Sequence, residues 1–242
     1  MKLLIDLHNH TIASGHAYST VYEIIMEAKR KGLKIIGITD HGPSMHGVLG
    51  EDFTGNLNIL PNSYNGVEVK TGVETNILDQ EGSLDIPERR LKRLDIIIAG
   101  LHDVVIKPWD KNGNTIALIK TMENKYVDII SHPGNPVFPI DKEAVVKMAK
   151  ETNTLLEINN GSFYNSRVGS KENCYEIAKL CKKYKVPIIV GSDSHFVADV
   201  GRFDEALELL ETINMPEELV INTSIEKFKE FMKIRNKAKE KL

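Results

Sequence analysis

The chain has 242 residues, enough for one large domain with a substantial core, and we expect a single domain over residues 1–242. Hydrophobic residues make up 41% of it and charged residues 27%, as in ordinary soluble globular proteins, and no run approaches the ~20 apolar residues of a membrane span. The formal net charge of −3 argues against a surface that binds nucleic acid non-specifically, so an anionic ligand must be attracted locally by a site.

The start of the chain and its two cysteines indicate a cytoplasmic protein. The apolar run Leu3–Leu7 is short and leads into histidines, so it lacks the pattern of a signal peptide. Cys174 and Cys181 are seven residues apart in a helical pattern, which is too far for a disulfide along one helix. We therefore expect two buried, reduced thiols.

Seven short apolar runs predict strands. Their β-branched, continuously apolar composition is typical of strands buried on both faces, as in a parallel sheet. The predicted strands are Leu3–Leu7, Ile35–Thr39, Val69–Val73, Asp95–Ala99, Val127–Ser131, Leu155–Asn159 and Pro187–Gly191. Segments with helical periodicity and capping residues stand between and after them. The predicted helices are Thr20–Lys31 with Ser19 or Thr20 as N-cap, Asn114 or Thr115 to Asn124, Asp141–Lys150, Ser170–Tyr184, Asp204–Ile213 and Ser224–Lys237.

Strand–helix alternation of this kind implies parallel strands joined by crossover helices. A doubly wound open sheet and a closed barrel of seven strands both fit. Polar ligand candidates follow six of the seven predicted strands, and an open sheet concentrates its site at one switch point, whereas a closed ring places all strand ends around one rim. The sequence therefore favours an α/β fold, a distorted TIM-like (β/α)7 barrel with a metal site at the C-terminal rim of the strands.

Two connections are longer than plain turns. Gly42–Gly66 follows the strand end that carries His41, and Asp103–Asn114 follows the one that carries His102. Long loops tend to be lids or substrate walls, so we expect both to lie over the site, with a neutral surface excursion as the alternative.

Histidines mark the expected rim. Of eight histidines, seven sit at or just beyond strand ends, and only His46 is left over in a loop. Each of the pairs His8-x-His10 and Asp193-x-His195 places two donors on one face of a strand end. Repeated placement of this kind favours metal binding over a structural role. The candidate ligands are His8, His10, His16, His41, Glu74, His102, His132, Asp193 and His195.

Seven imidazoles and two carboxylates exceed the roughly four ligands of one zinc ion, so they suit two or three ions with a bridging carboxylate. Imidazole-rich donors favour divalent Zn, Mn or Fe over Ca or Mg, and Zn is the first expectation. Three ions would bring about +6 against about −2 from Glu74 and Asp193, so the pocket should attract a phosphate dianion. Metal-activated hydroxide at such a cluster suits hydrolysis of a phosphate monoester. We therefore expect a phosphatase with a small phosphorylated substrate.

These motifs resemble the PHP family, named for polymerase and histidinol phosphatase. The matching residues extend through nearly the whole chain: His8-x-His10 with His16, Thr39-Asp40-His41, Glu74, His102, Ser131-His132-Pro133 and Gly191-Ser192-Asp193-Ser194-His195. The strings from Ser131 to Pro136, from Leu156 to Asn160 and from Asn165 to Arg167 are similar to those of the bacterial YcdX-type phosphatases. The resemblance implies a distorted (β/α)7 barrel, a trinuclear metal site and phosphatase activity.

The resemblance also implies a ligand set for each ion. His8, His10 and Asp193 would hold the first ion, His16, His41 and His195 the second, and His102 and His132 the third, with Glu74 bridging the first and third. Asp6 lies on the strand face of His8, where it would either orient an imidazole or be a hydrogen-bonded residue at the barrel bottom.

Residues outside the ligand set are expected to handle the substrate. Arg167 follows the sixth strand, and its guanidinium suits bidentate contact with phosphate oxygens, with a surface arginine as the alternative. Asn160 either contacts substrate or forms a turn. The general acid stays open among Asp103, His46 and a metal-bound water, and Asp103 beside His102 is the candidate catalytic residue.

Other functions compete with the phosphatase prediction. A phosphodiesterase or nuclease would act on nucleic acid, for which the chain lacks a basic stripe. Amidohydrolases also begin with His-x-His, but they carry a bridging lysine where this chain has His102. A non-catalytic metal-binding accessory domain would have to act through a partner. The expected partner is a small molecule, not a membrane or nucleic acid, and the sequence leaves the oligomeric state open.

Overall fold

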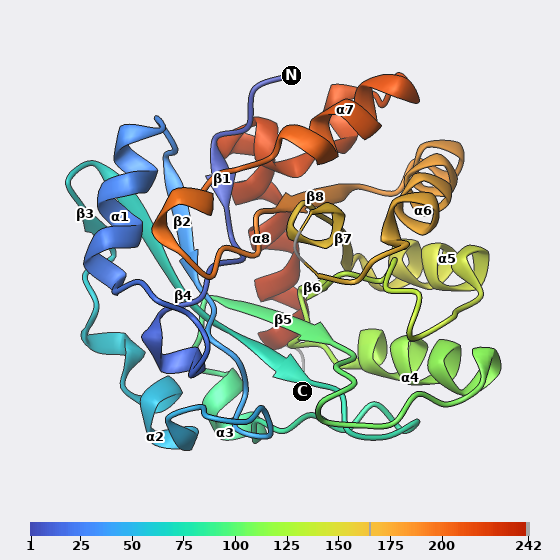
Figure 1. The fold of residues 1–242 in the computed structure, drawn as a ribbon, viewed down its shortest axis with the longest axis horizontal. Coiled ribbons are helices and arrows are strands. Elements are labelled where there is room, and N and C mark those ends of the chain that lie inside the picture. Colours follow the sequence, from blue (N-terminus) through green and yellow to red (C-terminus); the bar gives the residue numbers. More distant parts are fainter. Residues whose placement is uncertain (165, 241–242) are drawn as a thin grey trace.

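Seven parallel strands form the frame of the protein. The computed structural model describes residues 1–164 and 166–240. Within this part, hydrogen bonds join the parallel strands in the order β1 Ile5–Asp6, β2 Ile35–Ile38, β4 Val67–Asn76, β5 Ile96–Gly100, β6 Ile129–Ile130, β7 Leu155–Asn159 and β8 Ile188–Gly191. The short strand β3 Ser63–Tyr64 pairs antiparallel with β4. A parallel bridge between Asn9 and Ser194 links the two ends of this order. The predicted distorted (β/α)7 barrel is therefore confirmed (Figure 1).

Strand β4 is longer than predicted. It lies between β2 and β5: its residues 68–71 pair with β2, its residues 72–76 pair with β5, and a bridge from His41 to Glu74 continues the β2 side. The strand therefore extends well beyond the predicted Val69–Val73. The predicted strand is shorter because Glu68 and Glu74 interrupt the apolar run at its two ends, although both belong to the strand. This extension carries Glu74 into the middle of the rim.

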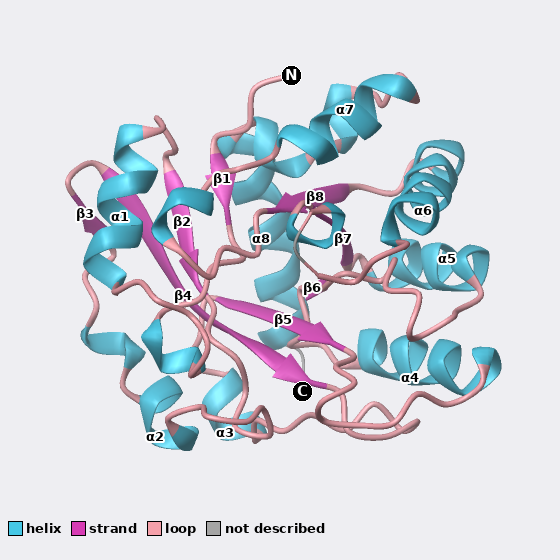
Figure 2. Ribbon diagram, viewed as in Figure 1, coloured by secondary structure: helices cyan, strands magenta, loops and turns pink. Residues whose placement is uncertain are grey.

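Helices cover the outside of the barrel. They are α1 Val21–Arg30, α2 Gly50–Gly55, α3 Glu88–Leu91, α4 Lys111–Glu123, α5 Lys142–Thr152, α6 Ser170–Tyr184, α7 Asp204–Thr212 and α8 Ile225–Glu240. Thr20 caps α1 through a reciprocal capping box with Glu23. Helix α4 begins before the predicted Asn114 or Thr115, because the side chain of Asp110 accepts the Gly113 N–H at 2.7 Å and caps it. Figure 2 shows α4, α5 and α6 side by side outside the strands.

Alternate strand residues face two separate cores. In β5, Ile96 and Ile98 point into the barrel, whereas Ile97 and Ala99 pack outward in the larger cluster beneath the helices. Helix α8 adds Phe228 and Phe231 to the inner cluster. These rings pack at the N-terminal end of the barrel, and the ligand candidates lie at the opposite end, where the strands finish.

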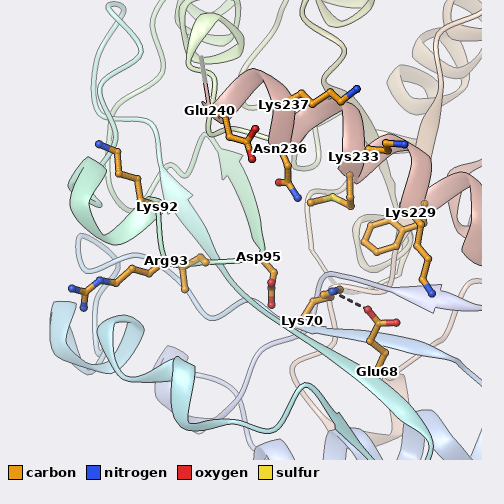
Figure 3. Close-up of a pocket in the computed structure, with 13 residues that line it drawn as sticks. Glu68, Lys70, Lys92, Arg93, Asp95, Lys229, Lys233, Asn236, Lys237 and Glu240 are labelled. Atoms are coloured by element: carbon orange, nitrogen blue, oxygen red, sulfur yellow. Dashed lines mark ion pairs between the residues drawn. The ribbon is translucent and has the colours of Figure 1, made fainter. Parts of the chain in front are cut away.

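The closed end has a hollow of its own, about 690 Å³, between α8 and the chain that leads into β5 (Figure 3). Lysines of α8 such as Lys233 line it together with Lys92, and acidic residues are mixed among them. Lys70 pairs with Glu68 at 2.8 Å across its wall. The described residues of this hollow include no histidine.

Two expectations concern the chain as a whole. Among the described helices, none combines the length and hydrophobicity that a membrane crossing requires. Cys174 and Cys181 are free, buried thiols on α6, and burial raises the pKa of each to about 12.

Candidate metal centre

The strand ends bring the predicted ligands to one rim. His8 and His10 follow β1 with one residue between them, and their ring centroids lie 5.0 Å apart. A bridge from His41 to Glu74 places the chain after β2 beside β4. The chain after β5, β6 and β8 supplies His102, His132, Asp193 and His195. His16, in the loop after β1, stacks near this group, and its ring centroid is 4.8 Å from that of His195.

Glu74 lies at the centre of the cluster. Its side chain is fully buried, and five imidazole nitrogens lie within 3.5 Å of its oxygens. Oε2 faces His8 Nε2 at 3.2 Å, His10 Nε2 at 3.5 Å and His41 Nδ1 at 2.9 Å, and Oε1 faces His102 Nε2 at 3.3 Å and His132 Nε2 at 2.8 Å. The two oxygens therefore face different sets of imidazoles, as a bridging carboxylate requires.

Asp193 is the second carboxylate of the cluster. Its Oδ1 lies 3.4 Å from His8 Nε2 and 3.2 Å from His10 Nε2. Its Oδ2 accepts hydrogen bonds from Arg167 at 2.9 Å and from the Asn159 amide at 3.1 Å. One oxygen is thus turned toward the cluster, and the other is held in place by protein donors.

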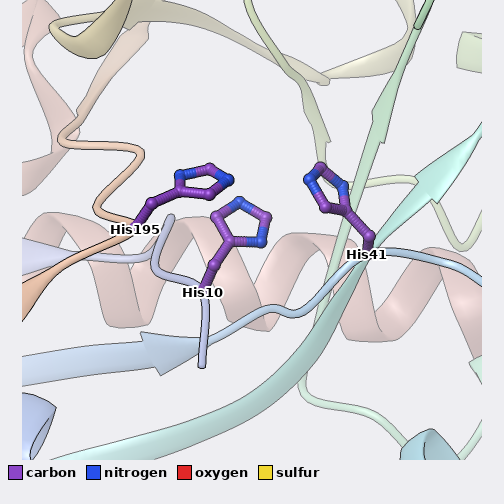
Figure 4. Close-up of side chains that lie close together, drawn as sticks. All are labelled: His10, His41 and His195. Atoms are coloured by element: carbon purple, nitrogen blue, oxygen red, sulfur yellow. The ribbon is translucent and has the colours of Figure 1, made fainter. Parts of the chain in front are cut away.

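Among the residues that the structure describes, three overlapping groups of donors have metal-ligand spacing. In each group the ligand atoms all lie within 4.8 Å of one another: His8 with His10 and Asp193, His41 with Glu74 and His102, and His10 with His41 and His195. Figure 4 shows the three rings of the last group turned toward one another. His16 Nε2 adds a further donor 3.0 Å from His195 Nε2.

The cluster fits divalent cations better than hydrogen bonding. Within the described residues, several of its buried atoms have no hydrogen-bond partner: His8 Nε2, His10 Nε2, His41 Nδ1, His102 Nε2, Glu74 Oε2 and Asp193 Oδ1. Each unpaired buried polar atom costs roughly 1–3 kcal/mol. Ligand atoms at ~2.0–2.1 Å from a tetrahedral zinc are roughly 3.3 Å from one another. The spacings around Glu74 run from 2.8 to 3.5 Å, so the donor set suits transition-metal ions.

Burial lowers the pKa of His10, His16 and His132 in the cluster. Burial lowers the pKa of His10 well below its ordinary value, and the neighbouring His41 adds to the effect. Burial, followed by the charge of Arg167, lowers the pKa of His132 to about 4. Neutral imidazole is the form that binds metal, so these side chains are ready to act as ligands.

His8 differs because carboxylates surround it. Burial lowers the pKa of His8, but Glu157, Glu74 and Asp193 together outweigh burial and raise that pKa well above 6.5. Burial likewise opposes ionisation of Glu74 and Asp193, yet the charge of His8 leads the effects that hold the pKa of both carboxyls well below the usual range. A bound cation would take the place of the His8 proton between these carboxylates.

Glu157 is a functional residue that the sequence analysis missed. It lies in β7, buried, with Oε1 2.7 Å from His8 Nδ1 and Oε2 accepting the His132 N–H at 2.9 Å. A Cβ on Gly191 of the neighbouring strand would collide with Glu157 Oε1, so the glycine makes room for this carboxylate. An acidic residue inside the apolar run Leu155–Asn159 was the available signal.

A second support acts on His10. Ser14 Oγ lies 3.0 Å from His10 Nδ1 and donates to Asp40 Oδ1 at 2.7 Å, so it accepts the His10 Nδ1–H and leaves Nε2 free. Asp6 has another role. Its carboxylate accepts the backbone N–H groups of Ser192 at 3.2 Å and Gly201 at 2.9 Å, so it is hydrogen-bonded to the chain after β8 and not at the barrel bottom.

Two ligand candidates have left-handed backbone conformations. His132 has φ +32° and Asp193 has φ +54°, and both come directly after strands. Non-glycine residues in this region carry strain that persists where the surrounding structure imposes it, and such residues gather at functional sites. Here each unusual φ turns a side chain from the strand direction back into the rim.

A cavity of about 770 Å³ opens above the cluster. The metal-ligand candidates His16, His41, His102, Asp193 and His195 form part of its lining, as does Arg167. Of the two long connections, Met45 and His46 line it from one, and Asp103 and Val104 from the other. The rest of the first loop forms α2 and β3 away from the cavity, because β3 pairs with β4.

Comparison with known proteins identifies the family. The PHP domain model matches residues 6–241. The chain belongs to the PHP family. A probable phosphatase of Caldanaerobacter subterraneus subsp. tengcongensis is 54% identical over 238 residues, which cover 98% of this chain and 94% of that one. A probable phosphatase of Clostridium botulinum (strain Langeland) is 53% identical over 240 residues, covering 99% and 98%.

A solved PHP-like structure supports the fold assignment. Histidinol phosphate phosphatase from Lactococcus lactis, complexed with zinc, L-histidinol and phosphate, superposes with a TM-score of 0.54 at 14% identity, over 88% of this chain and 94% of that one. At that identity the likeness concerns the distorted barrel alone.

The remaining predicted site residues of this PHP chain lie at different depths. The Arg167 guanidinium donates to Ser162 Oγ at 3.3 Å in addition to Asp193, on a backbone with φ +57°. Asp103 is exposed at the cavity wall. Asn160 is buried, and its Oδ1 accepts the Ala206 N–H at 2.9 Å, which ties it to α7. Asn165, one of the residues of the family resemblance, lies outside the described residues.

Proposed function

We propose that this PHP protein is a metal-dependent phosphatase that hydrolyses phosphate monoesters of small molecules at a trinuclear centre. The observation that carries the proposal is the convergence of seven imidazoles and two carboxylates on one rim, with buried ligand atoms that lack hydrogen bonds. The similarity to probable phosphatases, and the zinc and phosphate in the complex of the Lactococcus lactis histidinol phosphate phosphatase, point the same way.

The proposed ligand sets follow the family pattern. His8, His10 and Asp193 hold the first ion, His16, His41 and His195 the second, and His102 and His132 the third, with Glu74 between the first and third. The two oxygens of Glu74 and their separate imidazole neighbours support its bridging place. Zn is the first choice for imidazole-rich donors, with Mn or Fe as alternatives.

Charge explains the preference for phosphate. When bound, three divalent ions supply about +6 of charge, Lewis acidity and a water acidic enough to ionise near neutral pH. Arg167 projects beside Asp193 into the same cavity, and its guanidinium adds a planar donor for phosphate oxygens. The ester therefore binds with its phosphate on the rim and its alcohol part toward the cavity mouth.

The leaving alcohol needs a proton as the ester bond breaks. Asp103 follows the ligand His102 and lines the cavity, so we assign it as the proton donor. The exposed His46 lines the opposite loop and is the alternative donor. We expect the protein to act in the cytoplasm, where its buried thiols Cys174 and Cys181 stay reduced.

Phosphate release from p-nitrophenyl phosphate tests the proposal. The purified protein, loaded in turn with Zn, Mn and Fe and analysed for ions per chain, should release phosphate only when metallated. The activity of Glu74→Gln should fall by more than the ~10–100-fold that is typical when a residue hydrogen-bonded to a metal ligand is replaced. The exposed Glu172→Gln on α6 is the matched control and should behave as wild type. A fully metallated protein that is inert toward a broad panel of monoesters would contradict the proposal, and preference for bis(p-nitrophenyl) phosphate would favour a phosphodiesterase.

A further inference from the structure

The mouth of the cavity is lined by apolar side chains from five of the rim connections. They are Tyr18 after β1, Met45 after β2, Leu101 and Val104 after β5, Val137 after β6 and Phe196 after β8. Four of the six are also exposed to solvent: Tyr18 by 76%, Val104 by 55%, Phe196 by 51% and Val137 by 42%.

This arrangement differs from scattered surface hydrophobicity. Single exposed apolar residues are normal on any protein, whereas a contiguous apolar surface marks a binding site. These residues come from separate loops and meet at one cavity. Tyr18, Val104 and Phe196 each stand within two residues of a ligand candidate in the sequence, so the backbone that places the ligand candidates also places these side chains. The six apolar residues at the mouth are called the wall below.

The wall offers little to a second anionic group. Among the described residues that line the cavity, Arg167 is the sole lysine or arginine, and it already lies 2.9 Å from Asp193. Asp103 and Asp199 line the mouth as well. A second phosphate or a carboxylate on the alcohol part would therefore meet acidic and apolar side chains.

The polar side chains His46, Asn135 and Ser166 also line the cavity, but a hydroxyl held against Val104, Val137 or Phe196 would find no hydrogen-bond partner in those side chains. A buried hydroxyl without a partner costs roughly 1–3 kcal/mol, whereas apolar groups gain on leaving water. The cavity of about 770 Å³ falls within the ~300–1,000 Å³ range of sites for compact organic ligands.

We infer that the substrate is a monophosphate ester whose alcohol part is a compact, largely apolar ring without a second anionic group. The inference rests on the proposed phosphatase function and names its substrate class. Sugar phosphates and bisphosphates are disfavoured, because their hydroxyls and extra charge face the Val104, Val137 and Phe196 side chains.

A shape-matched pair of esters tests this directly. Cyclohexylmethyl phosphate and glucose 6-phosphate are both six-membered-ring esters of primary alcohols, and they differ in the ring oxygen and hydroxyls. The metallated protein should show a kcat/KM at least about tenfold higher for the cyclohexyl ester, since a single methylene in an apolar pocket is worth ~10–200-fold. Equal kcat/KM values would overturn the inference and leave the phosphatase proposal standing.

Substitutions at the mouth locate the source of the preference. Phe196→Ser and Val104→Ser should each reduce the cyclohexyl-to-glucose ratio by about threefold to tenfold, mainly through the cyclohexyl ester. Ile234→Ser, at a 50% exposed position on α8, is the matched control and should leave the ratio unchanged. A ratio unaffected by both mouth variants would overturn the assignment of the wall.

Binding gives a readout that does not need hydrolysis. Titration calorimetry compares 2-cyclohexylethylphosphonate with methylphosphonate on the metallated protein, and the larger ligand should bind at least about tenfold more tightly, which corresponds to about 1.4 kcal/mol. A tighter cyclohexyl ligand on a protein that hydrolyses neither ester would support the apolar binding preference of the mouth but count against the phosphatase function, and with it against the substrate class. Equal affinities would refute the inference.

Discussion

Glu157 Oε1 lies 2.7 Å from His8 Nδ1, and both side chains are almost completely buried. Because the carboxylate accepts the Nδ1 proton, Nε2 is the nitrogen of His8 that faces Glu74 and Asp193 and can bind a cation once its own proton is displaced. The other Glu157 oxygen accepts the His132 N–H at 2.9 Å. One side chain of β7, the strand without a ligand candidate, thus contacts ligand candidates from the strand ends of both β1 and β6.

Glu157→Gln should weaken metal binding without removing a ligand. An amide is a poorer acceptor than a carboxylate, and its NH2 group opposes the His8 or His132 N–H, so we expect metal affinity to fall by about 10–100-fold. Competition with a chromogenic chelator measures the change, and excess metal should restore most of the activity. The exposed Glu151→Gln on α5 is the control. Unchanged affinity in Glu157→Gln would show that the contact does not orient His8.

Metal binding at pH 7 should release about one proton from His8. The pKa of His8 in the metal-free protein is raised well above 6.5, so the side chain is protonated at pH 7 and an incoming cation must displace that proton. The number released should fall as pH rises through this raised pKa, and metal affinity should increase with pH over the same range. Calorimetry in two buffers of different ionisation enthalpy measures the release. Identical heats in both buffers would contradict it.

The convergence of the ligand candidates could be predicted from the sequence more readily than the side chains that support them, for a physical reason. Each ligand follows an apolar run, so strand periodicity alone places His8, His41 or Asp193 at a rim. Ser14 and Asp40 are 26 positions apart and meet only through the loop that curls back after β1, which no local pattern encodes. The predicted start of α4, at Asn114 or Thr115, is too late. The helix begins at Lys111 because the Asp110 side chain caps it, although the helical pattern of the residues that follow is weak.

Removing the metals should destabilise the fold. Ions that bind only the native state stabilise it by about 2.7 kcal/mol per site at a hundredfold excess over Kd. For a chain of this length about 1 kcal/mol shifts Tm by ~2–4 °C, so chelation should lower Tm by at least about 5 °C. Differential scanning fluorimetry with and without chelator measures this, and Glu74→Gln should show a smaller difference. A Tm independent of chelator would argue against ion binding by the rim.

Arg167→Lys should raise KM for the ester by about tenfold while leaving the metal content unchanged. The guanidinium presents planar paired donors and stays charged, and lysine replaces it with a single point charge. Steady-state kinetics and elemental analysis together separate two roles. A loss of metal would mean that Arg167 acts by holding Asp193, its partner at 2.9 Å, and not by gripping phosphate. Lys171→Ala, an exposed position nearby in sequence, is the control.

Arg235 joins α8 to the barrel, and we expect its replacement to lower the free energy of unfolding of the protein. The side chain is 3% exposed, with Nε 3.2 Å from Asp128 Oδ1 and further donors to the carbonyls of Thr152 at 2.8 Å and Lys125 at 3.0 Å. Arg235→Ala leaves the buried Asp128 carboxylate with only Lys239 Nζ, at 2.9 Å, as a charged partner among the described residues. Breaking a buried pair costs about 3–5 kcal/mol, and we expect a loss near the lower end of that range.

Urea unfolding measures the free-energy change, with Lys233→Ala on the exposed face of α8 as the control, expected within about 0.5 kcal/mol of wild type. Asp128→Asn alone should also destabilise. Adding it to Arg235→Ala should cost less than the sum of the two single changes, because the second substitution removes the charge that the first left without its guanidinium. Additive effects would mean that the guanidinium stabilises α8 through the backbone carbonyls alone.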